Sequence, residues 1–147
     1  MLLALVALLV TAGMAEATTD DVRKVNVDTT WANIRGQYGK VWSTLHPRYQ
    51  QVTTRAFWEA CKRKEARKGL GIEWLSVKAT DDYPDRLTLP LLGTISVTAV
   101  SMEAKIDYLG IRRTVRDTVY WVKVDGEWRG LWEPIQYRAY KAKRCPS

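Results

Sequence analysis

The chain has 147 residues, with 23 Lys and Arg against 16 Asp and Glu and a formal net charge of +7. This length suits one domain, which can bury about two-thirds of the surface of its unfolded chain. The chain has one histidine and two cysteines whose spacing matches no zinc or redox motif, so no metal site is expected. No phosphate-binding glycine loop or serine nucleophile motif is present, so we expect no cofactor.

Residues 1–17 have the pattern of a signal peptide. Residues 1–10 (MLLALVALLV) carry no polar side chain, and Ala15 and Ala17 place small residues where signal peptidase cleaves. The apolar run is shorter than the roughly 20 residues of a membrane span. We therefore predict a secreted, periplasmic or cell-envelope protein. The alternative is a protein anchored in the membrane by an uncleaved N-terminal segment.

Residues 18–27 are polar and are predicted to be a linker, which leaves a domain over residues 28–147. Apolar residues at helical spacing predict a helix over residues 30–45, ended by His46-Pro47. We expect His46 to cap a helix rather than to act as a base. A short helical turn is expected after Pro47, and a second helix over residues 54–68, with a threonine cap and Gly69 at its end.

After Gly71 the sequence has the alternation of strands. Strands are predicted over residues 72–79, 87–92, 95–108, 111–124 and 127–140. A change of apolar phase between Ala99 and Val100 predicts a β-bulge, and Asp125-Gly126 predicts a hairpin turn. The order of helices followed by long antiparallel strands indicates an α+β fold.

Three local patterns resemble small exported members of the nuclear-transport-factor-two-like superfamily, which includes ketosteroid isomerase and SnoaL-like proteins. They are WSTLHP at residues 42–47, Phe57 with Cys61, and VKVDGEWR at residues 122–129. The likeness covers residues 28–140. It implies N-terminal helices packed in a strongly curved, cone-like antiparallel sheet with a pocket at its open end. It implies no particular activity, because many members catalyse nothing.

The pocket of such a cone would be lined by two groups of residues. Tyr38 and Trp42 share one face of the first helix, and Arg113, Asp117 and Trp121 share one face of the strand 111–124. Burial would raise the pKa of the Asp117 carboxyl and make it a candidate base or ligand anchor. Alternatively, Asp117 is a structural ion-pair partner, or the opposite face of the strand points inward.

These features favour a non-catalytic binding or interaction module of the cell envelope with an aromatic-lined pocket. The alternative is a small isomerase- or hydrolase-like enzyme that uses Asp117. The expected partner is a small apolar ligand or an anionic envelope component, because basic clusters lie at residues 62–68, 112–116 and 138–144. Export argues against nucleic acid, and a homodimer stays open. Cys61 and Cys145 are expected to form a disulfide that ties the basic tail to the second helix.

Overall fold

The computed structural model describes residues 19–147, and the signal peptide predicted over residues 1–17 lies outside this range. Four helices come first: α1 (Thr19–Ile34), α2 (Tyr38–Thr44), α3 (Pro47–Gln50) and α4 (Arg55–Lys68). The strands β1 (Ile72–Leu89), β2 (Gly93–Tyr108), β3 (Ile111–Val124) and β4 (Glu127–Gly130) form one open antiparallel sheet in that order, and α5 (Pro134–Lys141) follows. The expected α+β class is confirmed.

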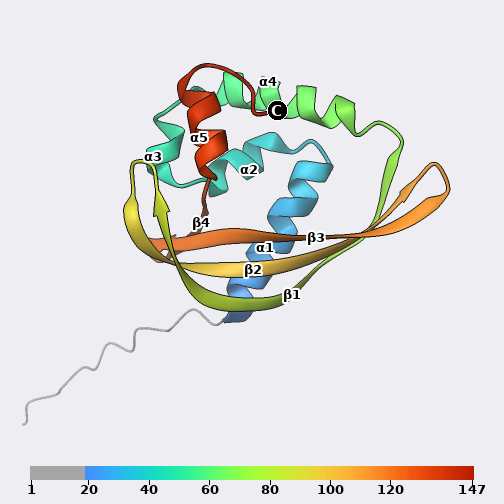
Figure 1. Cartoon of the computed structure of the whole chain (residues 1–147), viewed down its shortest axis with the longest axis horizontal. Coiled ribbons are helices and arrows are strands. Elements are labelled where there is room, and N and C mark those ends of the chain that lie inside the picture. The colour runs from blue at the N-terminus through green and yellow to red at the C-terminus, as the bar shows by residue number, and fades with distance from the viewer. Residues whose placement is uncertain (1–18) are drawn as a thin grey trace, which may run out of the picture.

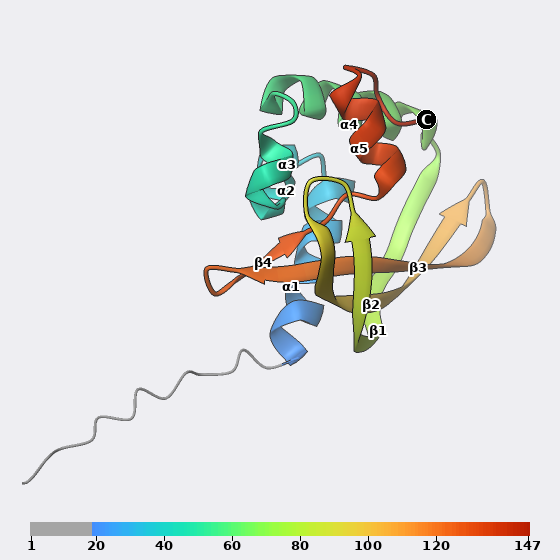
Figure 2. The same cartoon turned by 60° about the vertical axis from the view of Figure 1, so that its left-hand side comes forward.

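The helices are arranged around one end of α1. Figure 1 shows α1 running across the strands and the other four helices gathered beyond its C-terminal end. The β1–β2 hairpin bends toward these helices, as both views show (Figure 2). Arg48 of α3 donates a hydrogen bond of 2.6 Å to the carbonyl of Leu91 in the hairpin turn, and the Tyr49 hydroxyl lies 3.4 Å from the carbonyl of Pro90. The hairpin is thereby held against α3.

The region predicted as a linker, residues 18–27, is instead largely helical. From Thr19 onward these residues form the first half of α1, in which Val22 and Asn26 are buried against the sheet. The sequence shows no clear apolar helical pattern here, because Asn and Thr occupy several positions that face the sheet, as at Asn26 and Thr30. Residues 21–27 therefore belong to the packed domain rather than to a tether.

The single helix predicted over residues 30–45 is divided at Gly36. This glycine has φ +72°, and it donates a hydrogen bond to Asn33 O while Gln37 donates one to Ala32 O. This is the Schellman arrangement that ends a helix at a left-handed residue. Glycine adopts the left-handed conformation without a Cβ clash, so α1 stops here and α2 starts at Tyr38.

The strand β1 is continuous where two separate strands, 72–79 and 87–92, were predicted. Its pairing with β2 shifts register between Trp74 and Ser76 and again between Ala79 and Asp81. The bulge predicted within β2 between residues 99 and 100 is absent, since the register of β2 is unbroken there. Both residues are nevertheless fully buried, so β2 is covered on both faces at this point. The irregularity lies on the neighbouring strand.

The segment 127–140, predicted as one interrupted strand, is a four-residue strand followed by a helix. Pro134 opens α5, a position that proline favours because its missing N–H would be unpaired there anyway. The side chain of Gln136 accepts a hydrogen bond of 3.0 Å from the backbone N–H of Glu133. Tyr137 and Tyr140 then face the core. The periodicity of the segment is helical after Pro134, and the strand prediction there was wrong.

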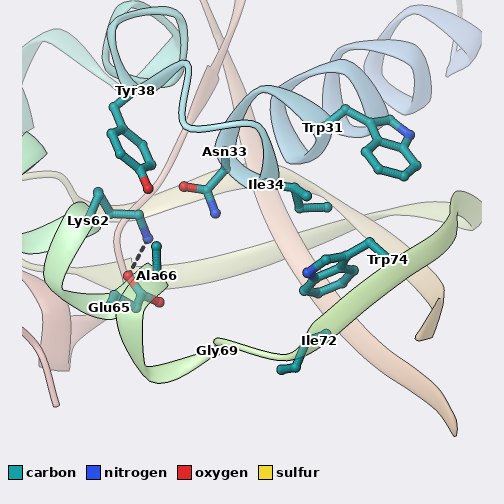
Figure 3. Close-up of a pocket in the computed structure, with 10 residues that line it drawn as sticks. All are labelled: Trp31, Asn33, Ile34, Tyr38, Lys62, Glu65, Ala66, Gly69, Ile72 and Trp74. Carbon is teal, nitrogen blue, oxygen red and sulfur yellow. Dashed lines mark hydrogen bonds and ion pairs between the residues drawn. The ribbon is translucent and has the colours of Figure 1, made fainter. Parts of the chain in front are cut away.

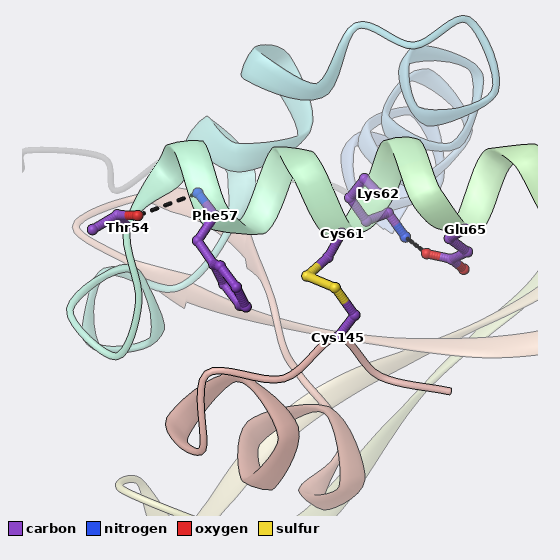
Figure 4. Close-up of a disulfide and its surroundings, with 6 residues drawn as sticks. All are labelled: Thr54, Phe57, Cys61, Lys62, Glu65 and Cys145. Carbon is purple, nitrogen blue, oxygen red and sulfur yellow. Dashed lines mark hydrogen bonds and ion pairs between the residues drawn. A yellow bond between two sulfur atoms is a disulfide. The ribbon is translucent and has the colours of Figure 1, made fainter.

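The predicted disulfide between Cys61 and Cys145 is present, with the two Cα atoms 5.2 Å apart. Figure 4 shows it joining the middle of α4 to the segment after α5. The predicted cap of α4 is also present, because the Thr54 hydroxyl accepts a hydrogen bond from Phe57 N, and Gly69 ends the helix. The basic tail is thereby fixed to α4.

Two clusters of buried side chains form the core. The larger cluster lies among the helices and contains Tyr49, which stacks on Trp132 at 5.1 Å between ring centroids, while Trp132 packs on Tyr140 at 4.6 Å. The smaller cluster joins α1 to the sheet through Val22, Val100 and Trp121. Within residues 19–147, no helix has the length and apolar character needed to cross a membrane.

Candidate functional site

Two pockets adjoin α1, and we call them the outer and the inner pocket. The outer pocket has a volume of about 460 Å³ and lies between α1, α4 and the start of β1 (Figure 3). Its lining residues are Trp31, Asn33, Ile34, Tyr38, Lys62, Glu65, Ala66, Gly69, Ile72 and Trp74. Aromatic rings from three elements, α1, α2 and β1, therefore surround this pocket.

The inner pocket has a volume of about 290 Å³ and lies between the helices α1, α2, α4 and α5 and the strands β2–β4. It combines aromatic walls with short polar side chains from α1. Its lining residues are Asn26, Thr29, Thr30, Asn33, Val41, Thr44, Leu45, Trp58, Lys62, Met102, Asp117, Val119, Trp121, Gly130, Leu131, Trp132, Gln136 and Tyr140.

The two pockets meet at Asn33 and Lys62, which line both. Figure 3 shows Asn33 projecting from α1 between Tyr38 and Lys62 on one side and Trp74 on the other. The Lys62 ammonium lies 2.5 Å from the carboxylate of Glu65, so its charge is compensated. The junction is therefore polar and carries little net charge.

The polar side of α1 consists of Asn26, Thr30 and Asn33, which lie four and three residues apart and so share one face of the helix. Asn26 Oδ1 accepts a hydrogen bond of 2.9 Å from Trp121 Nε1. The other amide atom of Asn26, Nδ2, and Asn33 Oδ1 are buried and have no hydrogen-bond partner within residues 19–147. Buried polar atoms are nearly always paired, and an unpaired one costs about 1–3 kcal/mol. A ligand that hydrogen-bonded to these two amides would remove this cost and so gain binding free energy at this wall.

The far wall of the inner pocket is aromatic. Trp58 and Trp132 are buried there, and Trp58 also packs on Trp42 at 5.5 Å between ring centroids. Burial, and secondarily the negative charge of Glu65, raises the pKa of Tyr140 strongly, so its hydroxyl stays neutral and can donate a hydrogen bond. The wall thus offers apolar area and the neutral Tyr140 hydroxyl as a donor.

The structure brings only some of the predicted site residues together. Asp117 and Trp121 line the inner pocket, whereas Tyr38 lines the outer pocket. Trp42 lies in neither lining and packs within the helical core. Arg113 is exposed on β3 and also lies outside both linings.

Asp117 lies on the predicted face of β3, together with Val119 and Trp121, but it is exposed. Its Oδ1 accepts a hydrogen bond of 2.8 Å from the N–H of Thr118. It has no ion-pair partner in the part of the chain that the structure describes, so the alternative of a structural ion pair is not formed there. The carboxylate stands at the mouth of the pocket and is solvated, without the apolar surroundings that a buried base would have.

His46, considered in the sequence as a cap or a base, caps α3. Its Nδ1 accepts a hydrogen bond of 3.1 Å from Arg48 N. Partial burial lowers the pKa of His46, and the positive charges of Arg48 and Arg129 lower it further. The neutral ring therefore has a structural role, as the acceptor that caps α3.

Asn26, Thr30 and Asn33 were not among the predicted site residues. The signal was present as their helical spacing, but Asn26 fell in the segment taken as a linker. Over residues 19–147, no three His, Cys, Asp or Glu side chains are grouped closely enough to hold a metal ion. The candidate site is the pair of cavities built from α1, α4 and the sheet.

Comparison of the chain with protein-family models, with curated proteins and with solved structures finds no match. The interpretation of the site therefore starts from its own geometry: two adjoining pockets, aromatic walls, and a row of amide and hydroxyl groups along α1.

Proposed function

We propose that the protein is an exported, non-catalytic binding module that holds a small, uncharged and largely apolar ligand in the two adjoining pockets. One observation carries the proposal: Asn33 stands where the pockets meet and has a buried amide oxygen with no hydrogen-bond partner within residues 19–147. A hydroxyl or N–H of a ligand would pair with that oxygen.

The walls support a ligand with an apolar body. Trp31 and Trp74 line the outer pocket, and Trp58 and Trp132 line the inner one. Pockets that combine hydrophobic and aromatic side chains with a few placed polar groups are typical of small-molecule sites. The charged pair at the junction, Lys62 with Glu65, is neutralised internally, which favours an uncharged ligand.

Export and the cone-like fold remain parts of the proposal. The disulfide between Cys61 and Cys145 is compatible with an oxidising, extracytoplasmic compartment. The order of helices and long antiparallel strands supports the likeness to the nuclear-transport-factor-two-like superfamily. The alternative, an isomerase- or hydrolase-like enzyme, has weaker support, because Asp117 is exposed. A binding role needs no buried carboxylate.

The test is a fluorescence titration with the uncharged probe N-phenyl-1-naphthylamine, whose emission rises in apolar surroundings. Ala66 lines the outer pocket from α4, so Ala66→Phe should fill part of the pocket and weaken binding about tenfold or more. Ala60 is exposed on the same helix and lines neither pocket, so Ala60→Phe is the matched control. Equal affinity of both variants and the parent protein would exclude the outer pocket.

The polar contact is tested by a second matched pair. Asn33→Ala removes the unpaired amide and should weaken binding of the probe about three- to tenfold if its N–H pairs with Asn33 Oδ1. Gln51→Ala removes an exposed amide from the end of α3 and should change nothing. Asp117→Asn tests the enzyme alternative, because only a functional carboxylate would make it abolish binding at unchanged stability. Loss of binding in Asp117→Asn but not in Asn33→Ala would overturn the proposal.

A further inference from the structure

The turn between β2 and β3 carries exposed apolar side chains. Leu109 is 76% exposed, and Tyr108 and Ile111 beside it are also exposed. Leu70, just after the end of α4, is 76% exposed as well. We call Leu70, Tyr108, Leu109 and Ile111 the apolar tip.

The members of the tip lie side by side in space. A Cβ placed on Gly71 would lie 3.7 Å from a ring carbon of Tyr108 and 3.8 Å from a methyl of Leu109, so the Leu70–Gly71 segment touches the turn. Figures 1 and 2 both show the α4–β1 connection beside the β2–β3 turn at one end of the molecule. Sequence-distant residues thus form one apolar projection.

The turn holds Leu109 in an unfavourable backbone conformation. Leu109 has φ +53°, a region in which glycine and asparagine are favoured and leucine is rare. Asp107 fixes the turn by accepting a hydrogen bond of 2.7 Å from Gly110 N. Since the Leu109 side chain contributes nothing to the buried core, its presence is not explained by folding. An exposed apolar projection of this kind indicates an interaction surface.

Cations surround the tip. Arg67 and Lys68 precede it at the end of α4, and Arg112 and Arg113 follow it on β3, all of them exposed. Arg112 lies 3.9 Å from the carboxylate of Asp107, while the other three form no ion pair within residues 19–147. The surface is therefore apolar at its centre, and its rim is net positive, with four cations against the carboxylates of Asp107 and Glu73.

We propose that the apolar tip docks on a lipid bilayer that carries anionic headgroups. The leucine and isoleucine side chains would enter the boundary between headgroups and acyl chains, while the surrounding cations pair with the phosphates. A soluble polyanion would use the cations but leave Leu109 and Leu70 in water, so it fits the surface less well. The tip borders the outer pocket through Gly69 and Ile72, but docking does not depend on whether that pocket binds a ligand.

The test is co-flotation of the protein comprising residues 18–147 with vesicles of phosphatidylglycerol and phosphatidylcholine. Vesicles of phosphatidylcholine alone are the comparison. Leu109→Asn keeps a residue that tolerates the left-handed turn and should lower the bound fraction on anionic vesicles several-fold. Leu91→Asn is the matched control, because Leu91 is an exposed leucine at φ +68° in the β1–β2 hairpin turn. It should bind like the parent protein.

The charge contribution is tested with variants of equal net charge. Lys68→Gln combined with Arg113→Gln should weaken binding to anionic vesicles about tenfold or more. Lys40→Gln combined with Arg144→Gln removes two exposed cations away from the tip and should have a small effect.

Three results would overturn the proposal. One is equal binding to neutral and anionic vesicles, and another is an equal loss in the tip variants and their controls. The third is self-association without lipid that Leu109→Asn abolishes in a protein that does not float with vesicles, since this would assign the tip to a second copy of the chain.

Discussion

Trp121 Nε1 on β3 donates a hydrogen bond of 2.9 Å to Asn26 Oδ1 on α1, across 95 positions of the sequence. Both residues are nearly fully buried, Trp121 with 2% and Asn26 with 1% of its surface exposed. Because a buried hydrogen bond requires both partners to be in place, this contact fixes the rotation of α1 on the sheet. It thereby sets the direction in which Thr30 and Asn33 face the pockets.

Trp121→Phe should lower the free energy of unfolding by about 1–3 kcal/mol beyond the effect of the smaller ring, because Asn26 Oδ1 is left buried and unpaired. Urea unfolding measures the loss. Trp128→Phe is the control, because Trp128 Nε1 has no hydrogen-bond partner within residues 19–147. Adding Asn26→Leu to Trp121→Phe should recover part of the loss, and a coupling free energy of zero between the two substitutions would contradict the prediction.

The disulfide between Cys61 and Cys145 should contribute about 4 kcal/mol to the free energy of unfolding, because it closes a long loop in the unfolded chain. Replacement of both cysteines by serine should lower the urea midpoint accordingly. Reductant should have the same effect on the parent protein and none on the double variant. Unchanged stability of the double variant would show that the bridge adds nothing to the packed tail.

Gly36 and Gly39 should respond in opposite ways to alanine. Gly36 has φ +72°, so Gly36→Ala should destabilise the protein by roughly 1–2 kcal/mol although no atom stands in the way of a Cβ. Gly39 lies within α2, where alanine gains up to about 1 kcal/mol in helix propensity. The three atoms nearest to a Cβ there all belong to the flexible Arg55 guanidinium, which can shift to make room. Thermal unfolding of both variants measures these changes. Equal losses of stability would contradict the assignment of the helix end at Gly36.

His46 should make stability fall below neutral pH. Its pKa is lowered in the folded state from the ordinary value of 6.5, so folding favours the neutral ring, and the stabilisation is present above the unfolded pKa and lost as pH falls below it. Protonation also removes the acceptor that holds Arg48 N. The melting temperature should therefore drop between about pH 7.5 and about pH 5.5.

His46→Asn provides the control for this pH dependence, since asparagine caps helices well and does not titrate. His46 is the single histidine of the chain. The variant should therefore show a flatter melting profile over the same range. An identical slope in both proteins would show that His46 is not responsible.

Local signals in the sequence predicted the helix α4 correctly. Thr54 and Gly69 bound α4 as expected, because capping depends on one residue and its immediate neighbours. The same holds for the turn at Asp125 and Gly126, both of which have positive φ. The pairing of Cys61 with Cys145 followed from there being two cysteines in a chain that looked exported.

The extent of α1 was not predicted, because its inward stripe contains Asn26, Thr30 and Asn33 in place of apolar side chains. Only the partner on the distant strand, Trp121, makes an asparagine suitable for burial at position 26. The face of Asp117 was predicted correctly from strand alternation, but not its exposure. Exposure depends on how far the helices cover β3, which alternation within one strand does not encode.

Cys61 and Cys145 enclose all four strands and α5 in one covalent ring. A single backbone cut anywhere in this ring opens it without releasing a fragment. The exposed hairpin turns at Leu91 and Leu109 are the places that a protease would reach first. A chain nicked once at either turn would therefore keep all its strands on one molecule, and would come apart only when the disulfide is reduced.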